Sequence, residues 1–349
     1  MRRLVPLFIL VLLLPTPAAP AEQRLLPRGT KVETFKSDLK FPIDMAWVPG
    51  TKKIFFTEKN SGKVRVLVGR RLLARACVDL AVASAGEQGA LGITLHPRFK
   101  KTRYLYVMYT NASPEEMRVT RFKVRNNRCR RPKTILQGVP ASSGYHNGGQ
   151  LEFAGGKLFI STGENHSPDE AQDTASRLGK ILRLNANGSV PSGNPFGNAV
   201  WSYGHRNPFG LAHQPGTERL FETENGPSCD DELNRIRKGR NYGWGGGYGC
   251  GTAGVGTDPK GPMKRWTPPV VPTDLWWYRG RMKKLSGSLY MGEFSSGRLH
   301  RFFLNDRGSR IRDDRVIFDA ASGIVDVSKG PGGWLYFMTA SAIHRIVPN

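Results

Sequence analysis

A histidine followed by an amide and two glycines stands just before a strand-like segment, in the run Tyr145-His146-Asn147-Gly148-Gly149. The glycines indicate a tight loop, and an imidazole with an ordinary pKa of about 6.5 can take up a proton near neutral pH. His146 is therefore a candidate general base. The alternative is a loop histidine whose hydrogen bonds are only structural.

Two donors stand side by side in a second irregular stretch, where Arg206 is followed by Asn207. A guanidinium presents its donors in a fixed fork, and the amide adds another donor next to it, so the pair suits a carboxylate or quinone oxygen of a ligand. A turn held by an arginine-to-backbone hydrogen bond is the competing interpretation.

Acidic residues gather in a third stretch, Glu224 to Asn234. Their carboxylates, with the main-chain carbonyls of the corner formed by Gly226 and Pro227, are oxygen ligands of the kind that a hard cation such as calcium prefers. The stretch is not an EF-hand, because the alternating acids and the terminal glutamate of that motif are missing. As an isolated motif the signal is weak.

These stretches lie between copies of a repeating unit. Each unit has a strand of alternating hydrophobic and polar residues, a turn with Pro or Gly, a second strand rich in large apolar residues and often a third with basic residues. The six copies begin near Met45, Leu91, Gly149, Gly210, Gly287 and Ile324. About one unit per 50 residues fits the four-stranded blades of a propeller, whereas a β-sandwich explains neither the spacing nor the repeated closing strand.

The predicted fold class is therefore all-β, a single six-bladed β-propeller over residues 22–349 with the two ends of the chain close together. The abundance of glycine (41) and proline (24) agrees with many short strands joined by turns. Loops between blades meet at a mouth of the central channel, so we expect the candidate residues to converge there.

The first residues have the pattern of a secretion signal. Arg2 and Arg3 precede the uncharged apolar run Leu4 to Leu14, and a small-x-small pattern ends at Ala21. The run is shorter than the roughly 20 residues of a membrane-spanning helix. Residues 1–21 are therefore predicted to be a cleaved signal peptide, and the mature protein to be periplasmic or secreted, without a transmembrane segment.

An exported chain can form disulfides, and four cysteines allow three pairings that the sequence alone cannot separate. Because nearby segments close more easily, we favour Cys77–Cys129 and Cys229–Cys250.

The net charge of +24 includes a run of eight basic residues without an acid from Arg118 to Lys133. Such a run can bind a polyanion, but no nucleic-acid-binding motif accompanies it, and we expect no nucleic-acid partner. An exposed basic surface that associates with anionic envelope polymers is the interpretation we favour.

Taken in order, these segments resemble the glucose/sorbosone dehydrogenase family. The resemblance implies a six-bladed propeller that oxidises aldose sugars at C1 by hydride transfer to pyrroloquinoline quinone (PQQ) with calcium, and that passes electrons to an external acceptor. The matching stretches span nearly the whole mature chain: Glu87-Gln88-Gly89 with Leu91-Gly92, Tyr145 to Gly149, Ala171-Gln172-Asp173 with Gly179-Lys180, Tyr203 to Gly210, Glu224 to Glu232, and Asn241 to Trp244.

The resemblance also implies roles for individual residues. His146 resembles the base that takes the proton of the sugar's C1 hydroxyl, and Gln88 a residue close to the sugar and the base. Arg206 and Asn207 resemble the pair that polarises the quinone oxygen. The carbonyls of Gly226 and Pro227 resemble the calcium ligands.

The C-terminal third departs from the family pattern. Gly323 and Val325 stand where the family has two arginines, Ser295 replaces a lysine, and Ala340 replaces an aspartate. Each charge-assisted hydrogen bond that is missing costs roughly 1.5–3 kcal/mol of binding. Five nearby cations could substitute: Arg279, Arg281, Lys283, Lys284 and Arg298.

The missing charges leave a second hypothesis open. It is a catalytically silent propeller that keeps the scaffold and binds a glycan, a polyanion or a protein.

Overall fold

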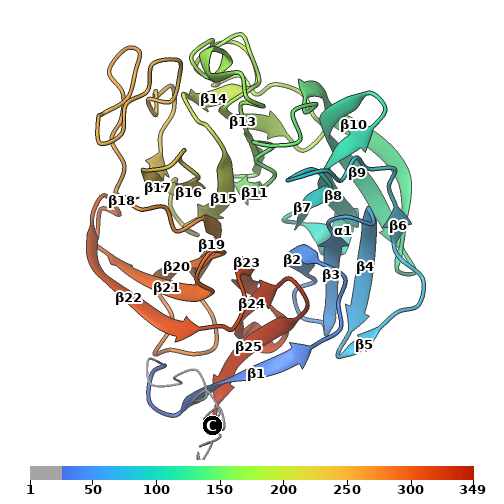
Figure 1. Cartoon of the computed structure of the whole chain (residues 1–349). Helices are drawn as coiled ribbons and strands as arrows, with labels where there is room; N and C mark the ends of the chain where they lie inside the picture. Colours follow the sequence, from blue (N-terminus) through green and yellow to red (C-terminus); the bar gives the residue numbers. More distant parts are fainter. Residues whose placement is uncertain (1–25) are drawn as a thin grey trace, which may run out of the picture.

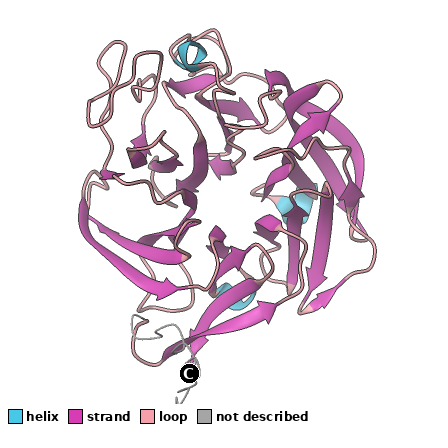
Figure 2. Cartoon of the chain, viewed as in Figure 1, coloured by secondary structure: helices cyan, strands magenta, loops and turns pink. Residues whose placement is uncertain are grey.

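The computed structural model describes residues 26–349, which form six antiparallel sheets arranged like blades around a central channel (Figure 1). Nearly all regular structure is strand, as Figure 2 shows. Within the described residues the helical elements are three short turns: α1 (Phe99–Thr102), η2 (Pro168–Ala171) and η3 (Pro331–Gly333). The predicted all-β, six-bladed propeller is confirmed. The predicted signal peptide, residues 1–21, lies outside the described residues.

In the first three blades the strands follow chain order from the channel outward. At the outer edge of blade 1, β4 pairs with both β5 and the short β6. Their bounds are β2 (Pro42–Trp47), β3 (Lys53–Glu58), β4 (Lys63–Val68), β5 (Arg71–Leu72) and β6 (Val78–Asp79); β7 (Ala90–Leu95), β8 (Tyr104–Ala112), β9 (Glu115–Arg125) and β10 (Arg128–Pro140); β11 (Leu151–Ala154), β12 (Lys157–Thr162), β13 (Lys180–Asn185) and β14 (Val200–Tyr203).

Blades 4 and 5 repeat this order, and blade 6 combines the two ends of the chain. Their strands are β15 (Pro208–His213), β16 (Leu220–Glu224), β17 (Asp231–Ile236) and β18 (Lys264–Trp266); β19 (Pro272–Tyr278), β20 (Ser288–Glu293), β21 (Arg298–Leu304) and β22 (Ile311–Asp319); β23 (Ile324–Lys329), β24 (Leu335–Thr339), β25 (Ile343–Pro348) and β1 (Thr30–Lys36).

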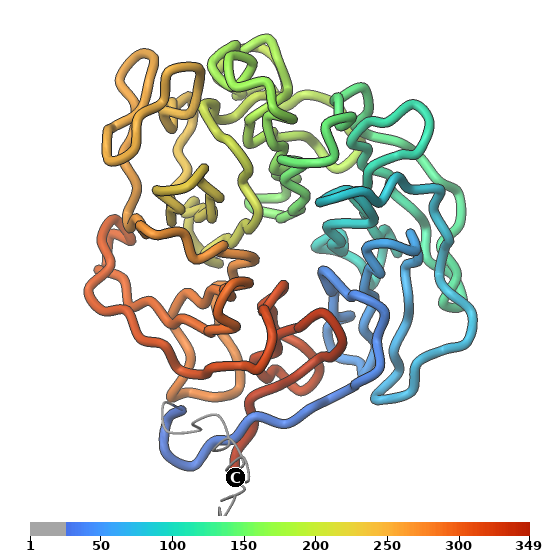
Figure 3. Tube along the Cα trace, in the orientation of Figure 1, coloured from blue at the N-terminus to red at the C-terminus, as the bar shows by residue number. Residues whose placement is uncertain are grey.

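The ring is closed by pairing of the first described strand with the last one. β1 is antiparallel to β25, so the blue and red ends of the trace run side by side (Figure 3). Arg345 adds a bidentate contact to one oxygen of Glu33, at 2.8 and 3.0 Å. The expectation that the chain ends meet is confirmed.

The six inner strands run in the same direction along the channel, because each blade has four alternating strands before the next blade begins. Loops that precede an inner strand therefore emerge on one face of the disc, which we call the site face. Loops that follow an inner strand emerge on the opposite face, called here the far face. This direction determines which residues can meet.

Buried apolar side chains fill the spaces between blades. Both favoured disulfides are present: Cys77–Cys129 links the outer parts of blades 1 and 2, and Cys229–Cys250 links two loops of blade 4. Among residues 26–349, no helix has the length and apolar character needed to cross a membrane.

The fifth repeat begins earlier than its sequence indicates. The pattern starts this unit at Gly287, but the inner strand of the blade is β19, whose sequence PTDLWWY lacks regular alternation. Its first five residues alternate poorly in polarity because both faces are buried or partly buried, as an inner strand packed between two neighbouring blades requires.

Candidate active site

His146 lies on the site face, in the loop before β11, and its imidazole is paired with a carboxylate. Nδ1 contacts Oε1 of Glu164, which follows β12. Glu164 is almost fully buried and its second oxygen has no hydrogen-bond partner among the described residues. Because an ionised carboxylate can only accept, Nδ1 carries the hydrogen and Nε2 keeps the lone pair that a base needs.

The backbone around His146 is held in an uncommon conformation. His146 has φ of 52°, in the left-handed region that side chains disfavour. Gly163 approaches so closely that a Cβ there would lie 2.0 Å from the carbonyl oxygen of His146. The ring also packs edge-to-face on His166, with centroids 4.3 Å apart. Such local strain is often found where a catalytic side chain must be positioned.

Glu87 joins three parts of the site. Its carboxylate accepts a hydrogen bond from the backbone N–H of His146 at 2.8 Å. It also accepts from the side-chain amide of Asn207 at 3.1 and 3.2 Å. Residues far apart in the chain are thereby brought together between blades 2, 3 and 4, as the interblade position of their loops predicts.

Gln88, the neighbour of Glu87, is directed elsewhere. It is buried, and its amide donates to the carbonyl of Ala141 at 2.7 Å and to the carboxylate of Glu115 at 3.2 Å. No hydrogen bond joins Gln88 to His146 among the described residues. In this structure Glu87 makes the contact with the histidine loop.

Arg206 and Asn207 precede β15 and are fixed by Glu224. One carboxylate oxygen of Glu224 accepts the backbone N–H groups of both residues, at 2.9 and 2.5 Å. The other oxygen accepts from Nδ1 of the buried His205 at 2.9 Å. The Glu224 carboxylate therefore fixes the turn from which the side chains of Arg206 and Asn207 extend.

The Arg206 side chain is only partly satisfied by the protein. Nη1 donates to the carbonyls of Asn225 and Gly226, at 2.9 and 2.7 Å, and the guanidinium lies over the ring of Trp244. Its buried Nε has no partner among the described residues. Burial lowers the pKa of Arg206, against the attraction of several nearby carboxylates. A ligand oxygen would satisfy the remaining donors.

The acidic stretch after β16 anchors its loop instead of presenting free carboxylates. Asp231 accepts from the backbone N–H of Gly226 at 2.8 Å and from Val270 and Val271 at 2.7 Å. Asp230 accepts from the Tyr248 hydroxyl, among other donors. Burial would raise the pKa of Asp230, but these hydrogen bonds outweigh burial and lower it. At the Gly226–Pro227 corner, the carbonyl of Gly226 accepts from Nη1 of Arg206.

At Ser295 and Gly323, two of the positions at which the sequence lacks an expected cation, a main-chain carbonyl lies close by. The Ser295 hydroxyl donates to the carbonyl of Val270 at 2.6 Å. A Cβ at Gly323 would lie 2.4 Å from the carbonyl oxygen of Phe294, so no side chain fits there.

Most of the proposed substitute cations cannot reach this face. The loop between β19 and β20 follows an inner strand and therefore lies on the far face; it carries Arg279, Arg281, Lys283 and Lys284. Arg298 is on the site face, but its Nε lies 3.8 Å from Oδ2 of Asp319, so its charge is paired within its own blade.

Sequence reasoning missed three charged residues of the site face: Glu87, Glu164 and Lys59. Lys59 follows β3, is buried, and donates to the carbonyl of Gly86 at 2.7 Å. Burial lowers the pKa of Lys59, whereas the negative charge of Glu87 raises it. A glutamate that follows a strand carries no sequence signal of its tertiary partner. Only Glu87 could have been suggested as a site residue, because it stands directly before Gln88.

Comparison with known proteins supports one family. A sequence model described as glucose/sorbosone dehydrogenase matches residues 39–347. The uncharacterized protein slr1608 of Synechocystis is 32% identical over 340 residues, which cover 86% of this chain and 82% of that protein. The aldose sugar dehydrogenase YliI of Escherichia coli K12 is 30% identical over 340 residues, with 90% and 91% covered.

A solved structure agrees with these relatives. The PQQ-bound form of aldose sugar dehydrogenase from Streptomyces coelicolor has a TM-score of 0.79 to this chain at 27% identity. The similarity covers 92% of this chain and 99% of that one.

Proposed function

This chain belongs to the glucose/sorbosone dehydrogenase family, and we propose that it oxidises aldose sugars at C1 with PQQ and calcium. The family membership supports a sugar dehydrogenase. The observation that carries the proposal furthest is the pairing of His146 with the buried Glu164 on the same face as the unfilled donors of Arg206.

His146 acts as the general base. With the hydrogen held on Nδ1 by Glu164, Nε2 accepts the proton of the sugar's C1 hydroxyl as the product carbonyl forms. Glu164 stabilises the positive charge that the imidazole then acquires. Glu87 keeps the histidine loop against Asn207, so the base and the cofactor donors hold one relative position. Gln88 donates to the carbonyl of Ala141 at the start of this loop. By the family resemblance, its side chain also lies close to the sugar in the complex.

PQQ, when bound, supplies the acceptor for the hydride that leaves C1. The residues present fit its quinone end: Arg206 has a buried unpartnered Nε, and the amide nitrogen of Asn147 is buried without a partner among the described residues too. Both are donors that a ligand oxygen would satisfy. The carboxylate-binding part of the site is weaker, since Ser295 and Gly323 replace cations.

Calcium would be held by the carbonyls of Gly226 and Pro227, with the cofactor completing the shell. A carbonyl oxygen has two lone pairs, so Gly226 can accept from Arg206 and still ligate a cation. Asp231 fixes the corner through the N–H of Gly226. Oxygen-only ligation of this kind suits calcium.

The decisive experiment is a titration of the purified apoprotein with PQQ in the presence of calcium, followed by the absorbance of the cofactor. We expect saturable binding, then bleaching when an aldose such as glucose is added. The absent cationic groups predict weaker cofactor binding than in a relative that keeps them. A protein that binds no PQQ at micromolar concentration would contradict the proposal and favour the silent propeller.

A separate surface supports the association with anionic polymers. A groove of about 1030 Å³ lies between blades 1 and 2 and has no acidic residue in its lining. Its basic residues are Lys53, Arg103, Lys123, Arg125, Arg128, Arg130 and Arg131. After export, the protein would lie in the periplasm or outside the cell, and this groove would bind envelope polyanions there. Electrons from the sugar would pass to an external acceptor.

A further inference from the structure

Three aspartates meet inside the channel at equivalent positions of three inner strands. Asp44 is the third residue of β2, Asp274 the third of β19 and Asp326 the third of β23. One carboxylate oxygen of each lies within 4.8 Å of the other two, and all three residues are buried. Equivalent register in neighbouring blades brings the same strand position to the same height in the channel, so the cluster is a product of the propeller repeat.

The three carboxylates differ in how far the protein satisfies them. Asp44 accepts the backbone N–H of Ile93 at 2.6 Å, and Asp274 accepts the side-chain amide of Gln150 at 2.8 Å. Asp326 is fully buried, and neither of its oxygens has a hydrogen-bond partner among the described residues. An unpartnered buried carboxylate that faces two others is strongly unfavourable unless a cation or protons compensate.

We propose that Asp44, Asp274 and Asp326 form a structural site for a divalent cation, calcium in the first place, that is separate from the cofactor site. Calcium binds oxygen at about 2.3–2.6 Å, so two of its ligands can be up to about 5 Å apart. The spacing of the aspartate oxygens, all within 4.8 Å, matches one ion at their centre. The ion would join blades 1, 5 and 6, where the ring closes.

An apolar layer separates this site from the candidate active site. The residues one position earlier in the inner strands are mostly apolar, and they line a small cavity on the site-face side of the cluster together with Asp44 and Gln150. These apolar residues are Ile43, Leu91, Phe209 and Val325. The cation would therefore act on the scaffold and would not touch the sugar or the quinone.

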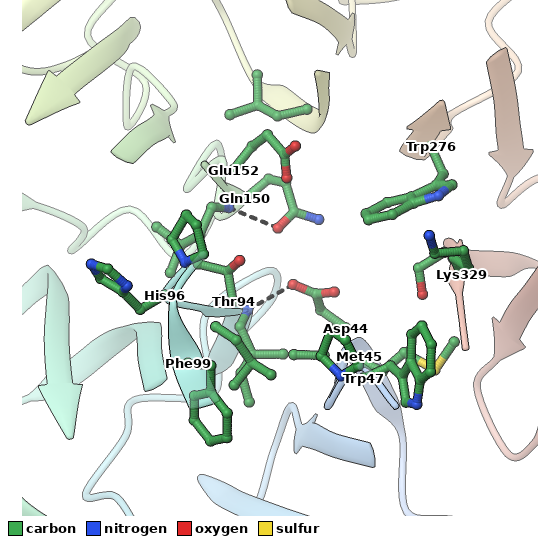
Figure 4. Close-up of a pocket in the computed structure, with 18 of the residues that line it drawn as sticks. Asp44, Met45, Trp47, Thr94, His96, Phe99, Gln150, Glu152, Trp276 and Lys329 are labelled. Carbon is green, nitrogen blue, oxygen red and sulfur yellow. Dashed lines mark hydrogen bonds between the residues drawn. The ribbon is translucent and has the colours of Figure 1, made fainter. Parts of the chain in front are cut away.

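The route to the cluster is from the far face. A cavity of about 600 Å³ reaches Asp44, Gln150, Glu152 and Asp274 from the ends of the inner strands. Figure 4 shows the Asp44 carboxylate and the Gln150 amide pointing toward each other across it, with Lys329 on another side. Lys329 is a cation at this mouth, so entry of the ion is opposed by charge repulsion and exchange should be slow.

Shared protons are the competing explanation, and they make the opposite prediction for one substitution. Burial, then the charge of Asp44 and of Asp274, raises the pKa of Asp326, so in a metal-free protein protons would neutralise the cluster. Replacing one aspartate by asparagine then removes an unfavourable buried carboxyl and should not lower stability. If a cation holds the cluster, the same substitution replaces a charged ligand by a neutral amide oxygen and weakens binding of the ion.

The test uses the mature protein stripped with a chelator and titrated with calcium in the absence of PQQ. In wild type we expect one bound calcium by equilibrium dialysis and a rise in Tm. At about 100-fold above the dissociation constant, mass action predicts a rise of about 4 °C. Asp326→Asn should lose this equivalent and this rise, while in chelator it melts at or above the wild-type temperature.

Controls keep the result decisive. Asp306→Asn removes an equally charged but exposed side chain and should behave like wild type. If Asp326→Asn fails to fold, Asp44→Asn serves instead, since its amide oxygen still accepts from Ile93. If neither folds, terbium luminescence decides. It should be displaced by calcium in wild type and lost in Trp276→Phe, because Trp276 lines the cavity at the cluster. Absence of bound calcium, or the same stoichiometry in wild type and a folded aspartate variant, would overturn the proposal.

Discussion

Nδ1 of His146 contacts the carboxylate of Glu164, 18 residues further along the chain and on the other side of the β11–β12 hairpin. The hairpin thus brings the proposed base and the carboxylate that contacts it together within one blade. Glu164 also donates its backbone N–H to the carbonyl of Arg206 at 2.9 Å. Glu164 therefore links the proposed base, His146, to the proposed cofactor-binding turn at Arg206.

The first prediction concerns the base. His146→Gln should lower kcat for sugar-dependent quinone reduction by about 10²–10⁴-fold, because a positioned base contributes that much. Cofactor affinity should stay nearly unchanged, since in the proposed complex Arg206 and calcium would hold the quinone. Steady-state kinetics and a PQQ titration measure the two effects. Arg206→Ala should reduce both, and a loss of cofactor binding in His146→Gln would reassign the histidine.

Glu164 is predicted to be a positioning residue. In Glu164→Gln the amide can donate to Nδ1 and so favour the tautomer with hydrogen on Nε2, which cannot accept the substrate proton. We expect kcat to fall by about 10²–10⁴-fold with little change in KM. Glu164→Asp should recover part of the loss. Equal losses in both variants, together with a lower Tm, would indicate a purely structural role.

Removal of either disulfide should lower stability, but removal of only one of them should also weaken cofactor binding. Loop-closure entropy predicts a loss of about 3 kcal/mol for the paired Cys229→Ser/Cys250→Ser variant and about 4 kcal/mol for Cys77→Ser/Cys129→Ser. Only the first pair borders the Gly226–Pro227 corner, so only its removal should also weaken PQQ and calcium binding. Urea unfolding and cofactor titration give the two readouts; equal cofactor affinity in both variants would contradict the link.

A buried histidine predicts a pH dependence of stability. Burial alone would lower the pKa of His300, but hydrogen bonds with Asp314 and Glu293 outweigh it and raise the pKa to about 9. The folded protein then binds more protons than the unfolded chain. His300 therefore contributes at most about 3 kcal/mol to the free energy of unfolding. This contribution is complete below pH 6.5 and is lost as the pH rises through 9.

The corresponding measurement is the free energy of unfolding in urea at several pH values. Wild type should become less stable between about pH 6.5 and 9, and His300→Gln should show a flatter profile in that interval. A variant profile parallel to that of wild type would mean that other groups cause the dependence.

The basic groove should dominate binding to polyanions. Arg125→Gln/Arg130→Gln removes two exposed charges that line it. We expect elution from a heparin column at lower salt, and a salt dependence of binding that falls by roughly one unit for each ion pair removed. The matched control, Arg310→Gln/Arg312→Gln, removes two charges from blade 5. An equal change in the control would show that total charge, and not the groove, governs retention.

The fold could be predicted from sequence because each blade repeats the same local pattern. Even so, the inner strand β19 was missed, since both of its faces pack against protein and polarity does not alternate along it. No local sequence pattern could identify β1 as the strand that pairs with β25, because the two strands lie at opposite ends of the described chain. Only the general rule that propellers close their ring placed the ends of the chain together.

The candidate site was predictable as a set of loops and less so as a set of contacts. The loops of His146 and Arg206 do meet through Glu87 and Glu164, because interblade loops share a face. Which of two adjacent residues, Glu87 or Gln88, faces the histidine depends on a backbone turn that carries no sequence signal. The acids near Asp231 match the ligand types of a cation site in sequence, but in the structure backbone N–H groups satisfy Asp231. Asp230 accepts from the hydroxyls of Tyr248 and Thr267 as well as from the N–H of Gly251.

The pairing of β1 with β25 has a consequence for how the protein is made. Glu33 and Arg345, which meet in that pair, are 312 residues apart. Blade 6 therefore cannot be completed until the ribosome has released nearly the whole chain, however early the other blades assemble. Contacts at such sequence separation are slow to form, because a long loop must close first. Until that step the nascent protein is an open arc in which β1 and the outer edge of β25 are unpaired.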